Sequence, residues 1–145
     1  MKLSTKGRYG VTAMFDLAMH YGEGAVPLKD IAARQGLSEH YLEQLIVPLR
    51  RAGLVRSIRG AQGGYLLARR PEEITVGDII RVLEGPIAPV DCVIVDSGFE
   101  QYCDKADNCV TRAIWRKLRD SINAVLDSVT LADLCRDDAS PQEKK

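Results

Sequence analysis

Apolar residues recur at intervals of three and four from the first helix onward, which is the spacing of one buried face of an α-helix. The first such face consists of Val11, Met14, Phe15, Ala18 and Tyr21. Gly22 and Gly24 follow it, and glycine commonly ends a helix because left-handed backbone costs it little. The pattern predicts a first helix that these glycines end.

Two shorter helical patterns follow, with a glycine between them. Pro27 suits a helix start, and Leu28, Ile31 and Ala32 line one face of a short helix. Gly36 supplies a tight turn, and Ser38 can cap the next helix by accepting from a backbone N–H. Pro48 lacks that donor, so it predicts a kink or an end nearby. The second helix has a buried stripe made of Leu42, Leu45, Ile46 and Leu49.

The stretch "LVRSIRGAQGGYLLAR" predicts a β-hairpin, since a Gly-rich loop separates two β-prone runs. Arg56 and Arg59 lie near its tip. Two short helices joined by a glycine turn are the helix-turn-helix pattern, and a following hairpin makes it a winged helix. The loop is not a phosphate-binding loop, because no Gly-Lys-Ser/Thr sequence follows it.

The second half of the chain predicts a capped short helix, a break and one long helix. Thr75 can cap the short helix, and "EGPIAPVD" ends it. The long helix has about twenty residues by its periodicity. We expect its stripe to pack on a second copy of the chain, with burial inside one chain as the alternative. The stripe consists of Val110, Ile114, Leu118, Ile122, Val125 and Val129.

Charge is sorted along this chain of 145 residues, which is long enough for one domain, or one domain plus an extension. Residues 1–70 carry 11 Lys/Arg against 5 Asp/Glu, and residues 71–145 carry 9 against 15. A basic half favours a polyanion as partner. No apolar run suits a membrane span and no signal core opens the chain, so we expect a cytoplasmic protein. No catalytic triad, nucleotide loop or HExxH helix is present, so we predict no enzyme.

A recognition helix needs polar side chains where it enters the major groove. Glutamine can bond adenine through its amide, and glutamate can accept from cytosine, while arginines on the flanks meet phosphates or the minor groove. The double-stranded DNA contacts predicted on this basis are Ser38, His40, Tyr41, Glu43, Gln44, Arg50, Arg51 and Arg59.

Cys92, Cys103 and Cys109 lie close together in an acidic segment. Intracellular thiols stay reduced, so clustered cysteines favour metal ligands or a redox centre. Three thiolates suit an iron–sulfur cluster with a fourth ligand from elsewhere, whereas a disulfide switch needs only two of them. A lone cysteine such as Cys135 is most often a small buried hydrophobe.

Several motifs resemble the winged-helix transcription factor family of the iron–sulfur cluster regulator IscR and the nitric-oxide sensor NsrR. They are "KGRYGVTAMFDLA", "GLSEHYLEQL", "LVRSIRGAQGGYLL", "ITVGDII" and "CVTRAIW", and they cover residues 1 to about 134. The resemblance implies a DNA-binding homodimer that carries a 2Fe–2S cluster on Cys92, Cys103 and Cys109. It also implies DNA contacts from Arg59 and Gly60 in the wing, and dimerisation through the long helix.

Two features depart from that family. The segment between the first two cysteines is longer, and Arg112 stands where the family often has a histidine. Arginine has no lone pair for a metal, so the fourth ligand is unassigned. Its candidates are His40, Glu43, Asp104 and Asp107, or a solvent molecule or small thiol.

The sequence therefore predicts a mainly α fold with a small β-hairpin, built as a winged helix-turn-helix plus a dimerisation helix. We expect a transcriptional regulator, mainly a repressor, of iron–sulfur cluster assembly genes. Sensing of nitric oxide, iron or cysteine status, or a thiol switch, is the alternative. The expected divisions are a DNA-binding domain (1–70), a connecting helix and linker (71–90), a cysteine loop (91–110), a dimerisation helix with the C-terminal segment (111–134) and a disordered tail (135–145).

Overall fold

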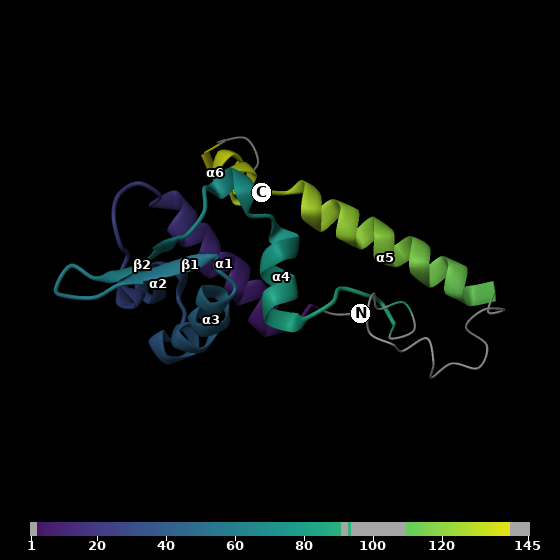
Figure 1. Cartoon of the computed structure of the whole chain (residues 1–145), viewed down its shortest axis with the longest axis horizontal. Helices are drawn as coiled ribbons and strands as arrows, with labels where there is room; N and C mark the ends of the chain where they lie inside the picture. Colours follow the sequence, from purple (N-terminus) through teal and green to yellow (C-terminus); the bar gives the residue numbers. More distant parts are fainter. Residues whose placement is uncertain (1–2, 91–92, 94–109, 140–145) are drawn as a thin grey trace.

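The computed structural model of the chain describes residues 3–90, residue 93 and residues 110–139. These residues form a mainly helical fold with one antiparallel hairpin, which confirms the predicted fold class (Figure 1). The helices and strands are α1 (Thr5–Met19), α2 (Leu28–Gln35), α3 (Glu39–Arg51), β1 (Val55–Ile58), β2 (Gly64–Leu67), the 3-10 turn η1 (Pro71–Glu73), α4 (Val76–Glu84), α5 (Val110–Ser128) and α6 (Leu131–Ala139).

Helix α1 starts earlier than its apolar pattern indicates. Ser4 caps it by accepting from the Gly7 N–H, and the helix ends at Met19, before the glycines that were expected to end it. Its buried side includes Gly7 and Gly10, whereas Val11 and Phe15 are only half-buried. An apolar count misses this side because its two glycines let α4 approach closely instead of contributing side chains.

Helices α2 and α3 follow the predicted pattern. Gly36 ends α2 at a φ of 67°, in the left-handed region, and Ser38 accepts from the Tyr41 N–H at 2.9 Å to cap α3. Helix α3 continues for three residues beyond Pro48. All four predicted stripe residues of α3 are at most 1% exposed, so this helix is anchored by its apolar face.

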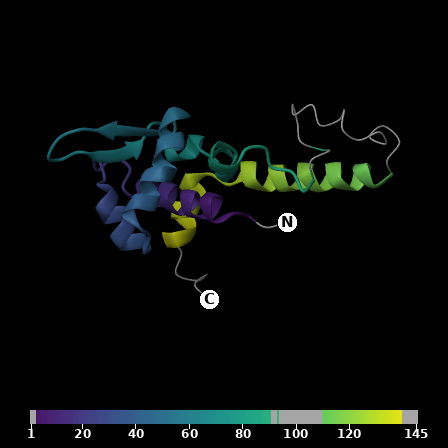
Figure 2. The ribbon, with the colours of Figure 1, turned by 90° about the horizontal axis from the view of Figure 1, so that it is seen from below.

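The hairpin is held by more than its own two strands. Val55 pairs with Leu67 and Ile58 with Gly64, and Val26 and Tyr65 exchange two backbone hydrogen bonds of 2.8 Å. A side chain at Gly64 would collide with the Val26 carbonyl. The hairpin therefore leaves the body of the domain in a fixed direction, as both ribbon views show (Figures 1 and 2).

Helix α6 corrects the prediction of a disordered tail from residue 135, because it runs to Ala139. Leu131 is fully buried and its N–H donates to the Ile74 carbonyl at 2.9 Å. Thr130 and Asp133 hydrogen-bond each other's backbone N–H groups, which caps the helix start. The Thr-x-x-Asp spacing was a usable signal, but the polar sequence after it obscured the helix.

No helix among residues 3–90 and 110–139 combines the length and apolar character that crossing a bilayer requires.

A buried carboxylate joins α1 to α2. Asp16 is 2% exposed, and its carboxylate accepts from Arg34 Nε and Nη2 at 3.0 and 2.7 Å and from Gln35 Nε2 at 2.9 Å. Burial raises the pKa of Asp16. The hydrogen bonds from Arg34 and Gln35 and the charges of Arg34 and His20 together lower it by more than burial raises it, so the pKa lies below its usual value. The folded protein therefore favours the ionised form.

Replacing Arg34 by methionine should destabilise the fold by about 3 kcal/mol at neutral pH, since it leaves Asp16 buried without its ion-pair partner. Asp16 contributes stability above its unfolded pKa of about 3.9 and loses it as the pH falls through its lower folded pKa. In Arg34→Met, burial instead disfavours ionisation of Asp16. The difference in unfolding free energy between this variant and wild type should therefore narrow as the pH falls below about 4. Urea unfolding across this range measures it.

Lys29→Met is the matched control, because Lys29 is an exposed charge on the same helix. Equal loss of stability in both variants, or a gap for Arg34→Met that does not change with pH, would contradict the role of the Asp16 ion pair.

Candidate functional site

Polar side chains of α3 face solvent at the end where the helix begins. His40, Glu43 and Gln44 are exposed, on the side opposite the buried stripe. The His40 Nε2 and Gln44 Nε2 atoms lie 3.3 Å apart, which orders both side chains when the imidazole nitrogen accepts. This group, called the recognition group below, presents an amide, an imidazole and a carboxylate on successive turns.

Ser38 and Tyr41 already have structural partners. Ser38 is exposed but its hydroxyl caps α3, and Tyr41 is half-buried with its ring edge-on to Tyr9 at a centroid distance of 5.9 Å. The Arg8 guanidinium lies 5.7 Å from the centre of the Tyr9 ring. The aromatic pair fixes α3 against α1, and Tyr9 lies outside the apolar pattern that predicts the first helix.

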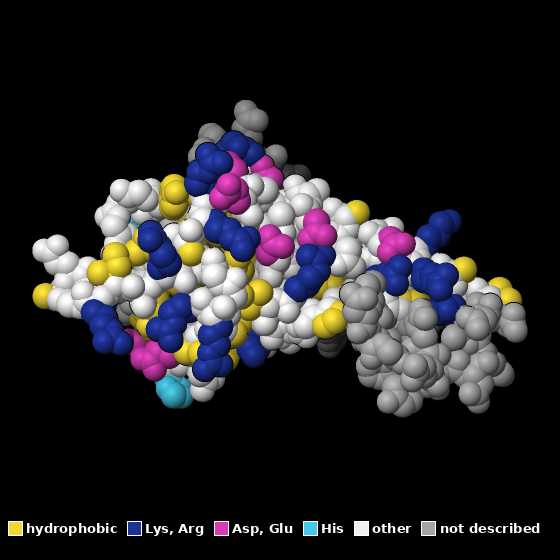
Figure 3. Space-filling model, in the orientation of Figure 1, with side chains coloured by type: hydrophobic (Ala, Val, Ile, Leu, Met, Phe, Trp, Pro, Cys, Tyr) yellow, Lys and Arg dark blue, Asp and Glu magenta, His cyan; other side chains and the backbone are white. Residues whose placement is uncertain are grey.

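Exposed arginines lie at the far end of α3 and on the hairpin. Arg50 and Arg51 are exposed in the last turn of α3, and Arg56 and Arg59 are exposed on the hairpin. Gly60, next to Arg59, has a φ of 111°, and the loop closes through a bond from the Gly63 N–H to the Gly60 carbonyl at 3.0 Å. In the space-filling view, Lys and Arg side chains are spread over the part of the molecule that contains α1, α2, α3 and the hairpin, which is called the DNA-binding lobe below (Figure 3). The surface suits a polyanion.

Helix α5 extends away from the rest of the fold (Figures 1 and 2). It carries an apolar stripe that the single chain leaves partly exposed. Ile114, Leu118 and Val125 are 58%, 39% and 62% exposed, and Ile122 is half-buried. Val129, the last predicted member of the stripe, lies one residue beyond the helix and is half-buried. Among the described residues of one chain, nothing covers the outer part of this stripe.

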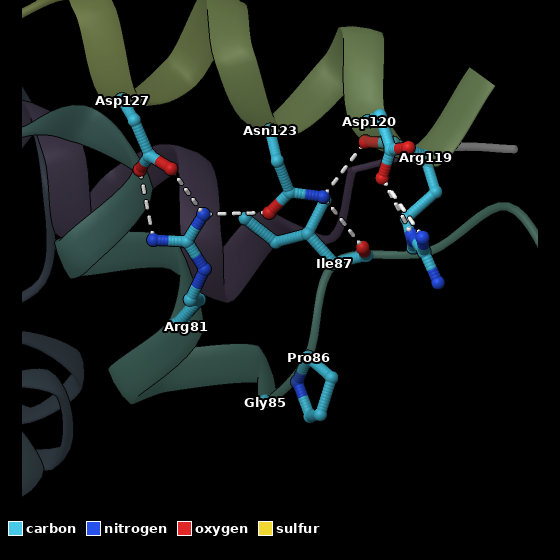
Figure 4. Close-up of a pocket in the computed structure, with 8 residues that line it drawn as sticks. All are labelled: Arg81, Gly85, Pro86, Ile87, Arg119, Asp120, Asn123 and Asp127. Carbon is cyan, nitrogen blue, oxygen red and sulfur yellow. Dashed lines mark hydrogen bonds and ion pairs between the residues drawn. The ribbon is translucent and has the colours of Figure 1, made fainter. Parts of the chain in front are cut away.

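The other side of α5 is bound to α4 by polar groups (Figure 4). Arg81 of α4 donates to both carboxylate oxygens of Asp127 at 2.8 Å and to Asn123 Oδ1 at 2.6 Å. The hydrogen bond from Arg81 lowers the pKa of Asp127. Sequence analysis missed these residues because 42 and 46 positions separate the partners.

Backbone carbonyls of the segment after α4 are also bound to α5. Asn123 Nδ2 donates to the carbonyls of Ile87 at 3.0 Å and of Arg119 at 2.8 Å. Arg119 Nη1 donates to the Val93 carbonyl at 2.9 Å, and its Nε bonds Asp120. The chain that follows α4 is therefore hydrogen-bonded to α5 at two carbonyls, those of Ile87 and Val93.

The predicted cluster ligands Cys92, Cys103 and Cys109, with Asp104 and Asp107, lie outside the described residues. Two residues near those cysteines in the sequence are described: Val93, directly after Cys92, is 2% exposed, and Arg112, three residues after Cys109, is 6% exposed. No group of three or more His, Cys, Asp or Glu side chains that suits a metal occurs in the described ranges. Cys135 is half-buried in α6, where burial raises the pKa of its thiol.

Comparison with known proteins identifies the family. Residues 3–137 match the model of the Rrf2 family, described as an iron-dependent transcriptional regulator. The chain belongs to the Rrf2 family of transcriptional regulators. Because the match includes both the winged helix and α5, the family assignment applies to the whole described structure.

Two kinds of named regulator are among its relatives. The chain is 56% identical over 134 residues to the regulator CymR of Bacillus subtilis, covering 92% of this chain and 89% of CymR. It is 44% identical over 142 residues to the regulator IscR of Aliivibrio salmonicida, covering 98% of this chain and 82% of that protein. The solved structure of T. potens IscR is 56% identical with a TM-score of 0.78, covering 100% of this chain and 93% of that one.

These relatives are DNA-binding transcriptional regulators rather than enzymes, and the chain is a regulator of the same family. The assignment to the IscR branch in particular is not decided by similarity. The solved structure of the B. subtilis global cysteine regulator CymR matches nearly as well, at 54% identity and a TM-score of 0.77 over 94% of this chain and 97% of CymR.

Proposed function

We propose that this Rrf2 regulator is a cytoplasmic homodimer, mainly a repressor, whose operator binding is controlled by a 2Fe–2S cluster and which regulates cluster assembly genes. The observation that carries the proposal is the placement of Cys92, Cys103 and Cys109. Cys92 lies directly before Val93, and Cys103 and Cys109 lie between Val93 and α5, in a chain 56% identical to T. potens IscR.

The donor set fits the group by its chemistry. Three thiolates are soft ligands that favour an iron–sulfur cluster over a hard cation, and their spacing lacks the close pairs typical of zinc sites. When bound, the cluster supplies an exchangeable, redox-sensitive group. The candidates for the fourth ligand remain Glu43, His40, Asp104 and Asp107, of which Glu43 and His40 are exposed on α3. Arg112 can offset negative charge but cannot ligate.

Double-stranded promoter DNA is the proposed ligand of the winged helix. The recognition group enters the major groove, where Gln44 and Glu43 meet base edges. Ser38 and Tyr41 hold the helix start and reach sugar or phosphate from there. Arg50, Arg51 and the wing residues Arg59 and Gly60 contact the backbone or the minor groove.

Two substitutions on this face should have different effects. Arg59→Ala should weaken binding to all sequences and make the slope of log affinity against log salt less steep by about one. Gln44→Ala should instead relax sequence preference at one base pair, at a cost of about 1–3 kcal/mol. Binding to an operator selected from random DNA, titrated with salt, measures both.

Arg136→Ala is the control, since Arg136 is exposed on α6, away from the hairpin. An unchanged salt slope in Arg59→Ala would remove the wing from the interface, and unchanged base preference in Gln44→Ala would remove Gln44 from base contact.

Dimerisation is proposed through the apolar stripe of α5. A row of exposed aliphatic side chains on a helix that projects from the fold is costly in water and is covered by the same stripe of a second copy. The Arg81, Asn123 and Asp127 contacts lie on the opposite side of the helix, so they are compatible with that pairing. Two copies would place two recognition helices on one operator.

Val125→Glu should convert the dimer to a monomer, because it introduces a charge into the apolar stripe. The position is 62% exposed in the single chain, so the monomer itself should remain folded. Sedimentation gives the mass, and circular dichroism gives the fold. Ala113→Glu, exposed on α5 but off the stripe, should stay dimeric. A dimeric Val125→Glu protein would show that the chain associates through another surface.

The cluster is tested on protein purified and reconstituted without oxygen. Wild type should show visible absorbance with iron and sulfide in equal amounts, and serine at Cys92, Cys103 or Cys109 should remove most of it, while Cys135→Ser keeps it. Alanine at each fourth-ligand candidate should shift the spectrum or shorten the half-life in one case only. Colourless wild type, or identical operator affinity with and without the cluster, would contradict the proposal.

A second candidate function is sensing of cysteine status, and the 56% identity to CymR favours it. In that case the same operator binding responds to cysteine metabolites, or to a reversible disulfide between two of the three cysteines, without iron. Metal-free protein distinguishes the two: operator affinity that changes with oxidant or cysteine metabolite but not with the cluster supports the second function.

A further inference from the structure

The Asn123 side chain makes three hydrogen bonds at a junction of three segments (Figure 4). Its oxygen accepts from Arg81 of α4, and its nitrogen donates both to the Ile87 carbonyl and to the Arg119 carbonyl of α5. Only a carboxamide of this length provides one acceptor and two donors there. Aspartate would place negative charge beside two carbonyl oxygens, and an apolar residue would leave Arg81 and Ile87 without these bonds.

Arg119 holds the same segment one helical turn away. Residues 119 and 123 share a side of α5, and they bind the carbonyls of Val93 and Ile87 respectively. Val93 is the residue after Cys92, and it is buried. A rearrangement that moves the Val93 carbonyl must therefore either break its hydrogen bond to Arg119 or shift the Arg119 side chain with it.

Movement of α5 is in turn transmitted to the DNA-binding lobe through α4. Arg81 bonds both Asn123 and Asp127, and Gly77 leaves room for this approach, since a Cβ there would lie 2.1 Å from Asp127 Oδ1. Helix α4 is buried on its other side through Ile79, Ile80 and Leu83, and it packs against both α1 and α3. A continuous set of hydrogen bonds and packed side chains thus joins Val93 to the recognition helix.

We infer that Asn123 and Arg119 are positioning residues that couple the state of the cysteines to operator binding, by tying Ile87 and Val93 to α5 and, through Arg81, to α4. The inference rests on the proposed function, since it concerns how the cysteine segment acts on DNA.

The test compares the ratio of operator dissociation constants between two states of the cysteines, cluster-loaded and cluster-free. Loss of a merely structural contact shifts both constants equally and leaves the ratio unchanged, whereas loss of coupling moves the ratio toward one. In Asn123→Ala the ratio of the two dissociation constants should change by roughly threefold or more, in the direction of one. This is the size of effect that single residues have on coupling. Cluster content should stay at the wild-type value, and the affinity of the cluster-free dimer should change little.

Arg119→Met repeats the test by removing the bond to Val93 together with the contact to the neighbouring Asp120, and it covers the case in which Asn123→Ala does not fold. Its matched control is Arg116→Met, the same substitution on an exposed residue three positions earlier in α5, which should keep the wild-type ratio. A wild-type ratio retained in folded Asn123→Ala or Arg119→Met overturns the inference and leaves the proposed function intact. A wild-type ratio of one overturns the proposed function, and the inference with it.

Discussion

The close approach of α4 to its neighbours is the constraint on which the rest of the structure depends. At one contact Gly10 of α1 leaves room for Leu83, where a Cβ would lie 2.0 Å from Leu83 Cδ1. At another, Gly77 of α4 leaves room for Asp127 of α5. Both contacts are short because a side chain is missing, so α4 packs on the DNA-binding lobe and α5 at the same time. Larger residues would separate the two parts that a regulator must connect.

The elements that sequence analysis predicted well are those stabilised locally. The stripe of α3, its Ser38 cap and the Thr75 cap of α4 depend on residues three or four apart, and periodicity or capping rules detect them. The glycine loop of the hairpin was visible for the same reason. Cys135 packs against the core, as expected of a lone cysteine, although the predicted disordered tail began at this residue.

Prediction failed where partners are distant in sequence. Asp16 lies on the α1 helix as an apparently ordinary acid, and only the fold places Arg34 and Gln35 around it. Arg81 and Asn123 look like helix-surface residues until α4 and α5 meet. The early start of α1 was missed because Gly7 and Gly10 contribute space rather than apolar surface, and the cysteine ligands lie outside the described residues, so their predicted role remains a prediction.

The two faces of α5 explain how one fold can serve regulators that are named for different signals, such as the relatives CymR and IscR. One face carries aliphatic side chains that a single chain leaves exposed, and the other carries the polar groups bonded to α4 and residues 87–93. Neither face requires a particular signal chemistry. The cysteines can therefore differ in their chemistry near Val93 and the start of α5 without requiring a change in the contacts of either face.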